Sequence, residues 1–243
     1  MKKIFIFSAL FMLCLITNYN ISNSQLINTV VSVTGEVIDQ ITRQPMSTTL
    51  EVFDDAGNKV TKVKSNAKDG YYFITGLKPG KSYTIRNMVD FDKSTRYFNE
   101  KIVMNIPNTD KYAEFSRDIL LLPLEKDLAV PIRVNPFFPN KSKLRVGSEM
   151  HLRHICNRMV ENPRVKFEIS CYPDNSLDEK ANMKLTEDRA KELKDYMVAK
   201  GVSDTRITIQ GNAKTDPKNP PPTHKMAKGK KYKGSIYIII KSY

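Results

Sequence analysis

Two neighbouring segments decide the fold of the second half of the chain: VKFEISC at residues 165–171 and LTEDRAKELKDYMVAKG at residues 185–201. In the first, apolar and polar residues alternate, as in a strand with one buried face. In the second, Ala190, Leu193 and Met197 recur at helical spacing, and the segment ends on the glycine that a left-handed C-cap favours. A strand, a polar loop and a helix are therefore predicted in succession.

The rest of this half, residues 131–243, extends the same pattern. Residues 148–161 have an apolar helix face, and a proline follows them. Alternating apolar residues predict strands at 206–210 and 235–241. Thr186 is a good N-cap and is predicted to start the second helix. The expected fold is an α+β sandwich of order βαβαβ-β, with helices covering one side of a sheet.

Residues 26–122 are predicted to be all β. Short runs rich in Val, Ile, Thr, Tyr and Phe are separated by turn signals, and no stretch has a helical period. Seven such runs indicate a small β-sandwich. They are residues 31–38, 48–53, 60–64, 71–74, 82–88, 98–106 and 113–122. Residues 123–130, charged and with one proline, are predicted to link this domain to the next.

Part of the first domain resembles a known module. TGEVID at residues 34–39, GYYFI at 70–74 and LKPG at 77–80 are similar to the carboxypeptidase regulatory-like (transthyretin-like) β-sandwich. The resemblance covers about 60 residues of the chain. It implies a structural or interaction module without catalytic activity.

The N-terminus has the three parts of a cleaved signal peptide. Lys2 and Lys3 supply positive charge, and residues 4–16 form an uncharged, mostly apolar run. That run is shorter than the ~20 residues that a membrane-spanning helix needs. Ser22 and Ser24 place small residues before a cut at Gln25, so residues 1–24 are predicted to be removed on export; a retained anchor is the alternative.

Charge and export together narrow the partners. The chain has 39 Lys and Arg against 26 Asp and Glu, a formal charge of +13. Removing residues 1–24, which hold two lysines and no acidic residue, lowers it to +11. A basic protein meets acidic partners, but an exported one does not meet genomic DNA, so no nucleic-acid partner is expected. Cys156 and Cys171 are predicted to be buried free thiols, because the expected helix and strand hold them too far apart for a disulfide.

A second resemblance concerns the second half. Asp174, Asn182 and then LTEDRA at residues 185–190 follow, in order and spacing, a motif of the OmpA C-terminal-like peptidoglycan-binding family. The resemblance implies that the domain binds peptidoglycan non-covalently. It assigns Asp174 and Arg189 to the ligand, with Asn182 and Thr186 shaping the loop and the helix start.

The residue types suit that ligand. Peptidoglycan stems carry a diamino acid that presents an ammonium and a carboxylate; Asp174 can accept from the first and Arg189 can donate a bidentate fork to the second. A structural ion pair is the alternative interpretation of the same two residues. Two segments depart from the family pattern: CYP at residues 171–173, and KKYKGS at 230–235 in place of Asn-Arg-Arg.

The resulting hypothesis is a non-enzymatic protein of the periplasm, associated with the outer membrane, that binds peptidoglycan and uses no catalytic residue, metal or cofactor. Its β-sandwich would dock outer-membrane proteins or proteins of type IX secretion and motility, because the pairing of modules resembles periplasmic anchors of that system. The alternative is a protein–protein scaffold whose OmpA-like domain has lost peptidoglycan binding. An enzyme or a carbohydrate-binding module is disfavoured, since the chain has no Trp for an aromatic platform.

Overall fold

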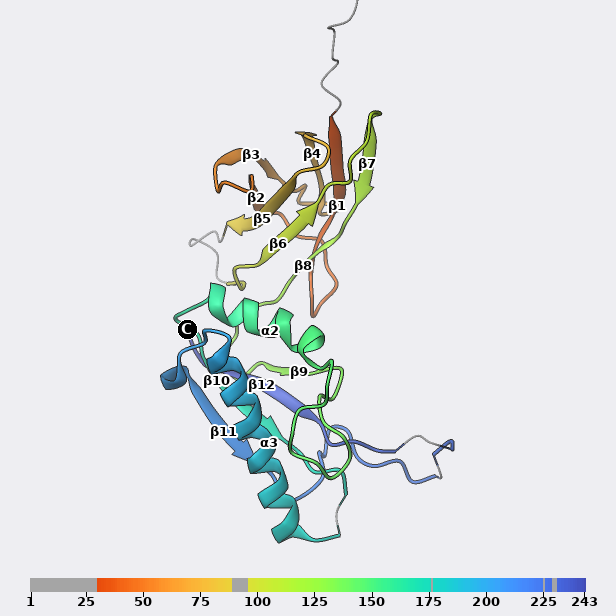
Figure 1. Ribbon diagram of the computed structural model, residues 1–243, viewed down its shortest axis with the longest axis vertical. Helices are drawn as coiled ribbons and strands as arrows, with labels where there is room; N and C mark the ends of the chain where they lie inside the picture. Colours follow the sequence, from red (N-terminus) through yellow and green to blue (C-terminus); the bar gives the residue numbers. More distant parts are fainter. Residues whose placement is uncertain (1–29, 89–95, 176, 225, 229–230) are drawn as a thin grey trace, which may run out of the picture.

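The computed structural model describes residues 30–88, 96–175, 177–224, 226–228 and 231–243. The described chain forms two bodies, one above the other in Figure 1. The predicted signal peptide, residues 1–24, lies outside the described residues. No described helix is both long and apolar enough to cross a membrane.

The upper body consists of two four-stranded sheets around one core. The first has β1 between β4 and β7, with β8 also paired to β1; the second has the order β3-β2-β5-β6. Apolar side chains from both sheets share a buried cluster, which includes Val33, Ile74, Leu50 and Ile85. The strands are β1 Val31–Asp39, β2 Thr49–Phe53, β3 Lys59–Lys64, β4 Tyr71–Leu77, β5 Ser82–Met88, β6 Lys101–Asn105, β7 Ala113–Ser116 and β8 Ile119–Leu121.

The single strand predicted at residues 113–122 is in fact two, β7 and β8. Both run parallel to β1, one along its first half and the other along its second. Between them the Arg117 N–H donates to Thr34 O at 2.7 Å. A Cβ on Gly35 would lie 2.1 Å from Arg117 O, so only glycine permits this close backbone approach.

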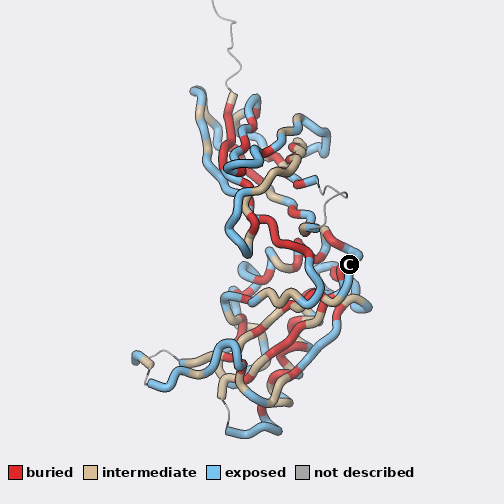
Figure 2. Tube along the Cα trace, turned by 180° about the vertical axis from the view of Figure 1, so that it is seen from behind, coloured by how far each residue is buried: buried red, intermediate tan, exposed pale blue. Residues whose placement is uncertain are grey.

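The lower body is a four-stranded sheet with two helices on one face (Figure 1). The sheet order is β11-β10-β12-β9; β10 and β11 are parallel and the other pairs antiparallel. Buried residues follow its central strands, as Figure 2 shows in red. The elements are β9 Ala129–Pro131, α2 Glu149–Glu161, β10 Lys166–Cys171, α3 Glu179–Ala199, the 3-10 helix η2 Asp204–Arg206, β11 Ile207–Gly211 and β12 Ile236–Ser242.

The prediction that Thr186 starts the second helix is wrong. α3 begins at Glu179, and Asp178 is its N-cap, accepting a hydrogen bond from the Ala181 N–H at 3.0 Å. Thr186 is fully buried in the helix interior, so Arg189 lies in the third turn rather than the first. The first two turns were missed because their sequence, EKANMKLT, has few apolar residues to mark a helix face.

The segment predicted as a linker is packed rather than free. Leu124 belongs to the core of the lower body, and its N–H donates to Arg96 O at 2.7 Å. Residues 129 and 130 are already in β9, which pairs with β12. The chain therefore passes from one body to the other along a fixed path.

A buried ion pair joins the two bodies. The Arg158 guanidinium on α2 donates to Glu100, just before β6, at 2.5 Å, and both side chains are at most 7% exposed. Arg158 also lies over the Phe98 ring, 5.7 Å from its centroid, and reaches Gln40 Oε1 at 3.3 Å. Because charges are desolvated here, the pair must be made in full for the two bodies to stay docked.

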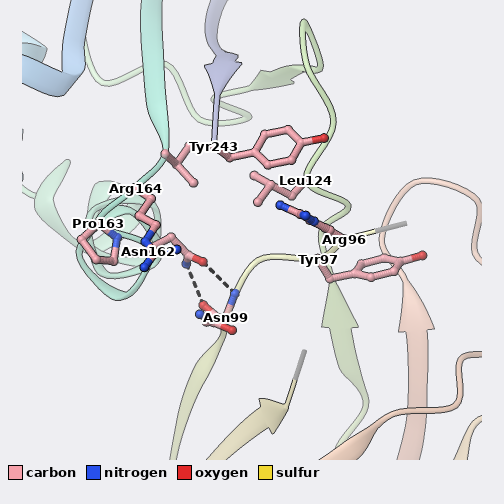
Figure 3. A pocket seen from close by; sticks show the side chains of 9 residues that line it. Arg96, Tyr97, Asn99, Leu124, Asn162, Pro163, Arg164 and Tyr243 are labelled. Atoms are coloured by element: carbon pink, nitrogen blue, oxygen red, sulfur yellow. Dashed lines mark hydrogen bonds between the residues drawn. The ribbon is translucent and has the colours of Figure 1, made fainter. Parts of the chain in front are cut away.

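Asn162 forms a second junction beside it. Its side chain accepts from the Asn99 N–H and donates to Asn99 O, both at 2.9 Å (Figure 3). Next to this junction is a cavity of about 340 Å³, with Arg96, Leu124 and Tyr243 in its wall. Both junctions use the C-terminal half of α2, so this helix fixes how the bodies are placed.

Both cysteines of the lower body are buried and free, as predicted. Burial raises the pKa of Cys156 to about 11 and that of Cys171 to about 12. The thiolate is the reactive form, so neither thiol should react with a water-soluble disulfide reagent at pH 8 in the native chain from residue 25. Both should react in urea. A fast native reaction of either thiol would contradict its placement.

Candidate functional site

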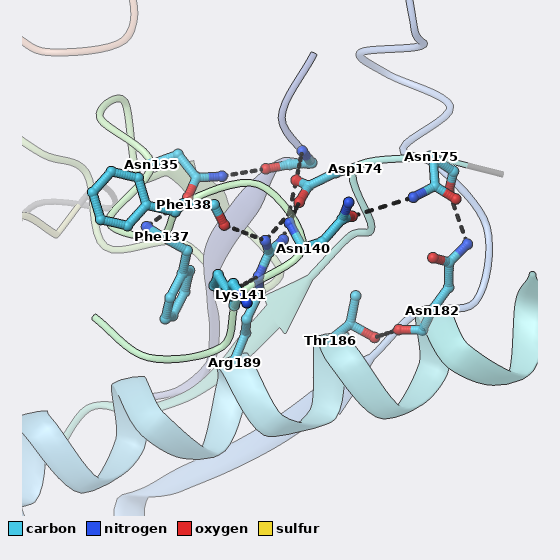
Figure 4. A network of polar contacts seen from close by, with 11 residues as sticks. Asn135, Phe137, Phe138, Asn140, Lys141, Asp174, Asn175, Asn182, Thr186 and Arg189 are labelled. Atoms are coloured by element: carbon cyan, nitrogen blue, oxygen red, sulfur yellow. Dashed lines mark hydrogen bonds and ion pairs between the residues drawn. The ribbon is translucent and has the colours of Figure 1, made fainter. Parts of the chain in front are cut away.

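Asp174 and Arg189 form a bidentate ion pair at the end of the sheet. Asp174 follows β10, and Arg189 projects from the middle of α3 (Figure 4). Arg189 Nη1 donates to Asp174 Oδ1 at 3.1 Å, and Nη2 donates to Oδ2 at 2.6 Å. The side chains are only 1% and 5% exposed for Arg189 and Asp174. The structure thus brings together the two residues on which the sequence hypothesis depends.

The loop between β9 and α2 covers the arginine. Arg189 Nε donates to Lys141 O at 2.8 Å, and Nη2 donates to Phe138 O at 3.2 Å. The guanidinium lies over the Phe137 ring, 5.2 Å from its centroid. Four of the five guanidinium N–H groups therefore have protein acceptors.

The aspartate is satisfied to the same degree. Oδ1 accepts from the Gly234 N–H at 2.8 Å, and Oδ2 accepts from the Asn140 N–H at 2.9 Å. Each oxygen of Asp174 thus accepts one bond from the arginine and one from the backbone, and its lone pairs are used. The pair ties together four segments: the covering loop, the end of β10, helix α3 and the start of β12.

These bonds determine the titration of Asp174. Burial acts to raise the pKa of its carboxyl, but the hydrogen bonds from Arg189, Asn140 and Gly234 outweigh burial and lower it below its ordinary value. A carboxyl with a lowered folded-state pKa stabilises the fold above its unfolded-state pKa, about 4, and loses that contribution as the pH falls through the folded-state value.

Asp174→Asn should therefore be most destabilising at neutral pH. The difference in unfolding free energy between the wild type and Asp174→Asn is expected to shrink as the pH falls below about 4. Urea unfolding of both proteins from pH 7 to pH 3 measures it. Carboxyls elsewhere, such as Asp39 and Asp216, titrate in both proteins and cancel. A difference that stays constant over this range would show that Asp174 is not held ionised by these partners.

Asn182 and Thr186 lie beside the pair and hold loops to α3. Asn182 Nδ2 donates to Asn175 O at 2.8 Å and to Ala213 O at 3.2 Å. Thr186 Oγ1 accepts from the Asn212 N–H at 2.9 Å and lies 3.0 Å from Asn182 O. Both residues are buried. Asn182 thus positions the loop that follows β10, while Thr186 fixes the segment after β11 and does not cap the helix.

Sequence reasoning missed the backbone groups that complete the site. Asn140 has φ 55°, a left-handed conformation that asparagine tolerates, and this turn aims its N–H at Asp174. The signal was present in PFFPN at residues 136–140, where two prolines and an asparagine mark a tight turn. Its closeness to Asp174, 34 residues away in the chain, could not be read from local pattern.

Gly234 is the other missed residue, and it admits no side chain. A Cβ there would lie 1.9 Å from Tyr172 O and 2.6 Å from Pro173 O, both backbone atoms. Gly234→Ala should lower the free energy of unfolding by about 3 kcal/mol, the upper end for overpacking, and displace the N–H that Asp174 accepts. Urea unfolding measures this. Gly57→Ala is the control, since its Cβ would meet nothing within 4 Å; equal losses would contradict the packing.

The described residues contain no group of three or more His, Cys, Asp or Glu side chains that could hold a metal ion. The polar network of Figure 4 consists of one ion pair, amide side chains and backbone groups. In chemical terms the site is a buried charge pair with a satisfied surround.

Comparison with known proteins assigns the domain. Residues 136–229 match the sequence model of the OmpA family, a span that contains both Asp174 and Arg189. The second half of the chain therefore carries an OmpA family domain. The match does not include residues 26–122, for which the carboxypeptidase regulatory-like module stays a prediction. A comparison with curated proteins found no match.

Solved structures with similar folds include three from bacteria. The peptidoglycan-associated lipoprotein from Burkholderia pseudomallei is 13% identical and covers 43% of this chain and 85% of its own, with a TM-score of 0.34. The OmpA-like domain of FopA1 from Francisella tularensis is 18% identical over 49% and 85%, with a TM-score of 0.34. The periplasmic domain of Helicobacter pylori MotB is 10% identical over 65% and 82%, with a TM-score of 0.37. All three scores are low, and the family match alone assigns the domain.

Proposed function

We propose that this is a non-enzymatic, exported protein of the bacterial cell envelope whose OmpA family domain binds peptidoglycan without a covalent bond. The observation that supports it most is the family match over residues 136–229, which contains the Asp174–Arg189 pair. The predicted signal peptide would place the protein in the periplasm, where peptidoglycan lies. The upper body would dock a partner in the outer membrane or in a secretion-associated assembly.

The ligand would be the diamino acid of the peptide stem. Its ammonium would bind Asp174, and its carboxylate would bind the Arg189 fork. Both groups already have protein partners, so the ligand must exchange with them. The covering loop is the segment that would move, because Lys141 O and Phe138 O are the arginine's partners other than Asp174. Peptidoglycan binding therefore predicts that residues 137–141 shift when the ligand is bound.

The experiment is sedimentation of the chain from residue 25 with purified sacculi, in competition with two soluble stem peptides. One contains meso-diaminopimelate; the other contains lysine, which lacks the side-chain carboxylate. The diaminopimelate peptide should release the protein and the lysine peptide should not. This comparison leaves the protein unaltered, so loss of fold cannot imitate loss of binding. Release by salt alone, with no effect of either peptide, would refute the pair as a peptidoglycan site and assign sedimentation to the charge of +11.

A specific observation favours a second candidate, a protein–protein scaffold that does not bind peptidoglycan. The pair is buried and its acceptors are filled, as in a structural ion pair. The same end of the domain carries Pro173 and lacks the family's Asn-Arg-Arg segment. For this candidate the wild type should not sediment with sacculi at moderate salt, and cross-linking in the envelope should instead recover a protein partner.

A further inference from the structure

A basic cavity lies at the β9 edge of the lower sheet, apart from the Asp174–Arg189 pair. Its volume is about 580 Å³. Two positive side chains, Arg133 and Arg145, come from the segment after β9. Two more, Lys231 and Lys233, come from the segment before β12. Among the described residues that line the cavity there is no carboxylate.

The backbone holds these two segments together. The Asn135 amide donates to Gly234 O at 2.8 Å, and the Ile132 N–H donates to Ile236 O at 2.8 Å. Pro131 pairs with Tyr237 in the ladder of β9 and β12. The four cations therefore share one cavity because of the fold, although the segments that carry them are about 90 residues apart in the chain.

The positive charge of the cavity is not neutralised by the described surroundings. None of the four side chains has an ion-pair partner among the described residues. Two carboxylates lie behind the wall, and both are engaged: Asp174 with Arg189, and Asp216 with the Tyr237 hydroxyl at 2.7 Å. Asp216 is 1% exposed, so it cannot reach into the cavity. Like charges this close repel unless an anion joins them.

We propose that this cavity binds an anion with two or more phosphate groups, in the form of a phosphorylated saccharide. Guanidinium groups bind phosphate through two parallel bonds, and lysines add charge without fixed geometry. The volume is that of a small-ligand site. Asn219, Ser235 and Tyr237 also line it and can bond to sugar hydroxyls. The source is either a soluble sugar phosphate or a phosphorylated lipid headgroup. This proposal is independent of peptidoglycan binding.

The test uses the chain from residue 25 and two probes. Calorimetric titration with fructose 1,6-bisphosphate, against fructose, measures soluble binding. Co-sedimentation with phosphatidylcholine vesicles, with and without phosphatidic acid, measures binding to a lipid headgroup. Each is repeated with Arg145→Gln/Lys233→Gln and with a control of equal charge loss, Arg153→Gln/Lys180→Gln, whose residues lie outside the cavity. Thermal unfolding confirms that each variant is folded.

The cavity variant should bind at least one probe about tenfold more weakly than the wild type, while the control keeps wild-type affinity. Loss confined to the bisphosphate identifies a soluble ligand, and loss confined to the vesicles identifies a headgroup. Equal weakening in both variants would overturn the proposal, because net charge would then explain binding. Absence of binding of both probes to the wild type at low salt would overturn it as well.

Discussion

Arg158→Ala is expected to lower the free energy of unfolding by about 3–5 kcal/mol, because it leaves the Glu100 carboxylate buried without a partner. The two side chains are 5% and 7% exposed, so water cannot replace the guanidinium without opening the junction between the bodies. The change also removes the contact with the Phe98 ring and the bond to Gln40. Urea unfolding followed by circular dichroism at pH 7 measures the loss.

Two further variants make this result specific. Arg153→Ala removes an exposed arginine from the same helix and should change the free energy of unfolding by less than about 0.5 kcal/mol. Arg158→Met combined with Glu100→Leu removes both charges and should recover most of the loss, since it leaves no buried charge. If Arg158→Ala behaves like Arg153→Ala, the ion pair is solvated and the bodies are not docked through it.

The docking also predicts how the protein unfolds. With the junction intact, the two bodies share buried surface and should unfold in one transition. Arg158→Ala weakens their coupling, so the two transitions should separate and probes of the upper and lower body should no longer coincide.

Much of the fold could be predicted from periodicity. The strand at Ser82–Met88 and the first lower-body helix follow the alternation or the apolar face that the sequence displays. The start of α3 could not be read from apolar spacing. Asp178 and Glu179 were its signal, an N-cap followed by an acidic first turn, and they occur in a segment that looks like a polar loop.

The residues of the candidate site could be named from sequence, but their state could not. Asp174 and Arg189 are 15 residues apart, and a motif links them. Whether they face a ligand or each other depends on Asn140 and on Gly234, which arrive from distant parts of the chain. Such long-range bonds leave no local pattern, so the closed geometry of the pair became visible only in the fold.

Asp174→Ala is the other substitution with a large expected effect. It leaves the Arg189 guanidinium buried with one charge uncompensated, and it removes the acceptor of two backbone N–H groups. The free energy of unfolding should fall by about 3–5 kcal/mol. Asp188→Ala, which removes an exposed carboxylate paired with Lys184 on the same helix, should cost less than about 1 kcal/mol.

This expectation changes how loss of peptidoglycan binding by Asp174→Ala would be interpreted. If the variant is destabilised as expected, its failure to sediment with sacculi reports a damaged domain as much as a lost contact. If instead Asp174→Ala is as stable as Asp188→Ala, the pair is open in solution and free to bind a ligand. The diaminopimelate peptide then supplies an independent measurement: a ligand that binds only the folded wild type must raise its melting temperature as its concentration rises. A rise with diaminopimelate and none with lysine would show that the ligand's carboxylate is bound even though the free protein holds the pair closed.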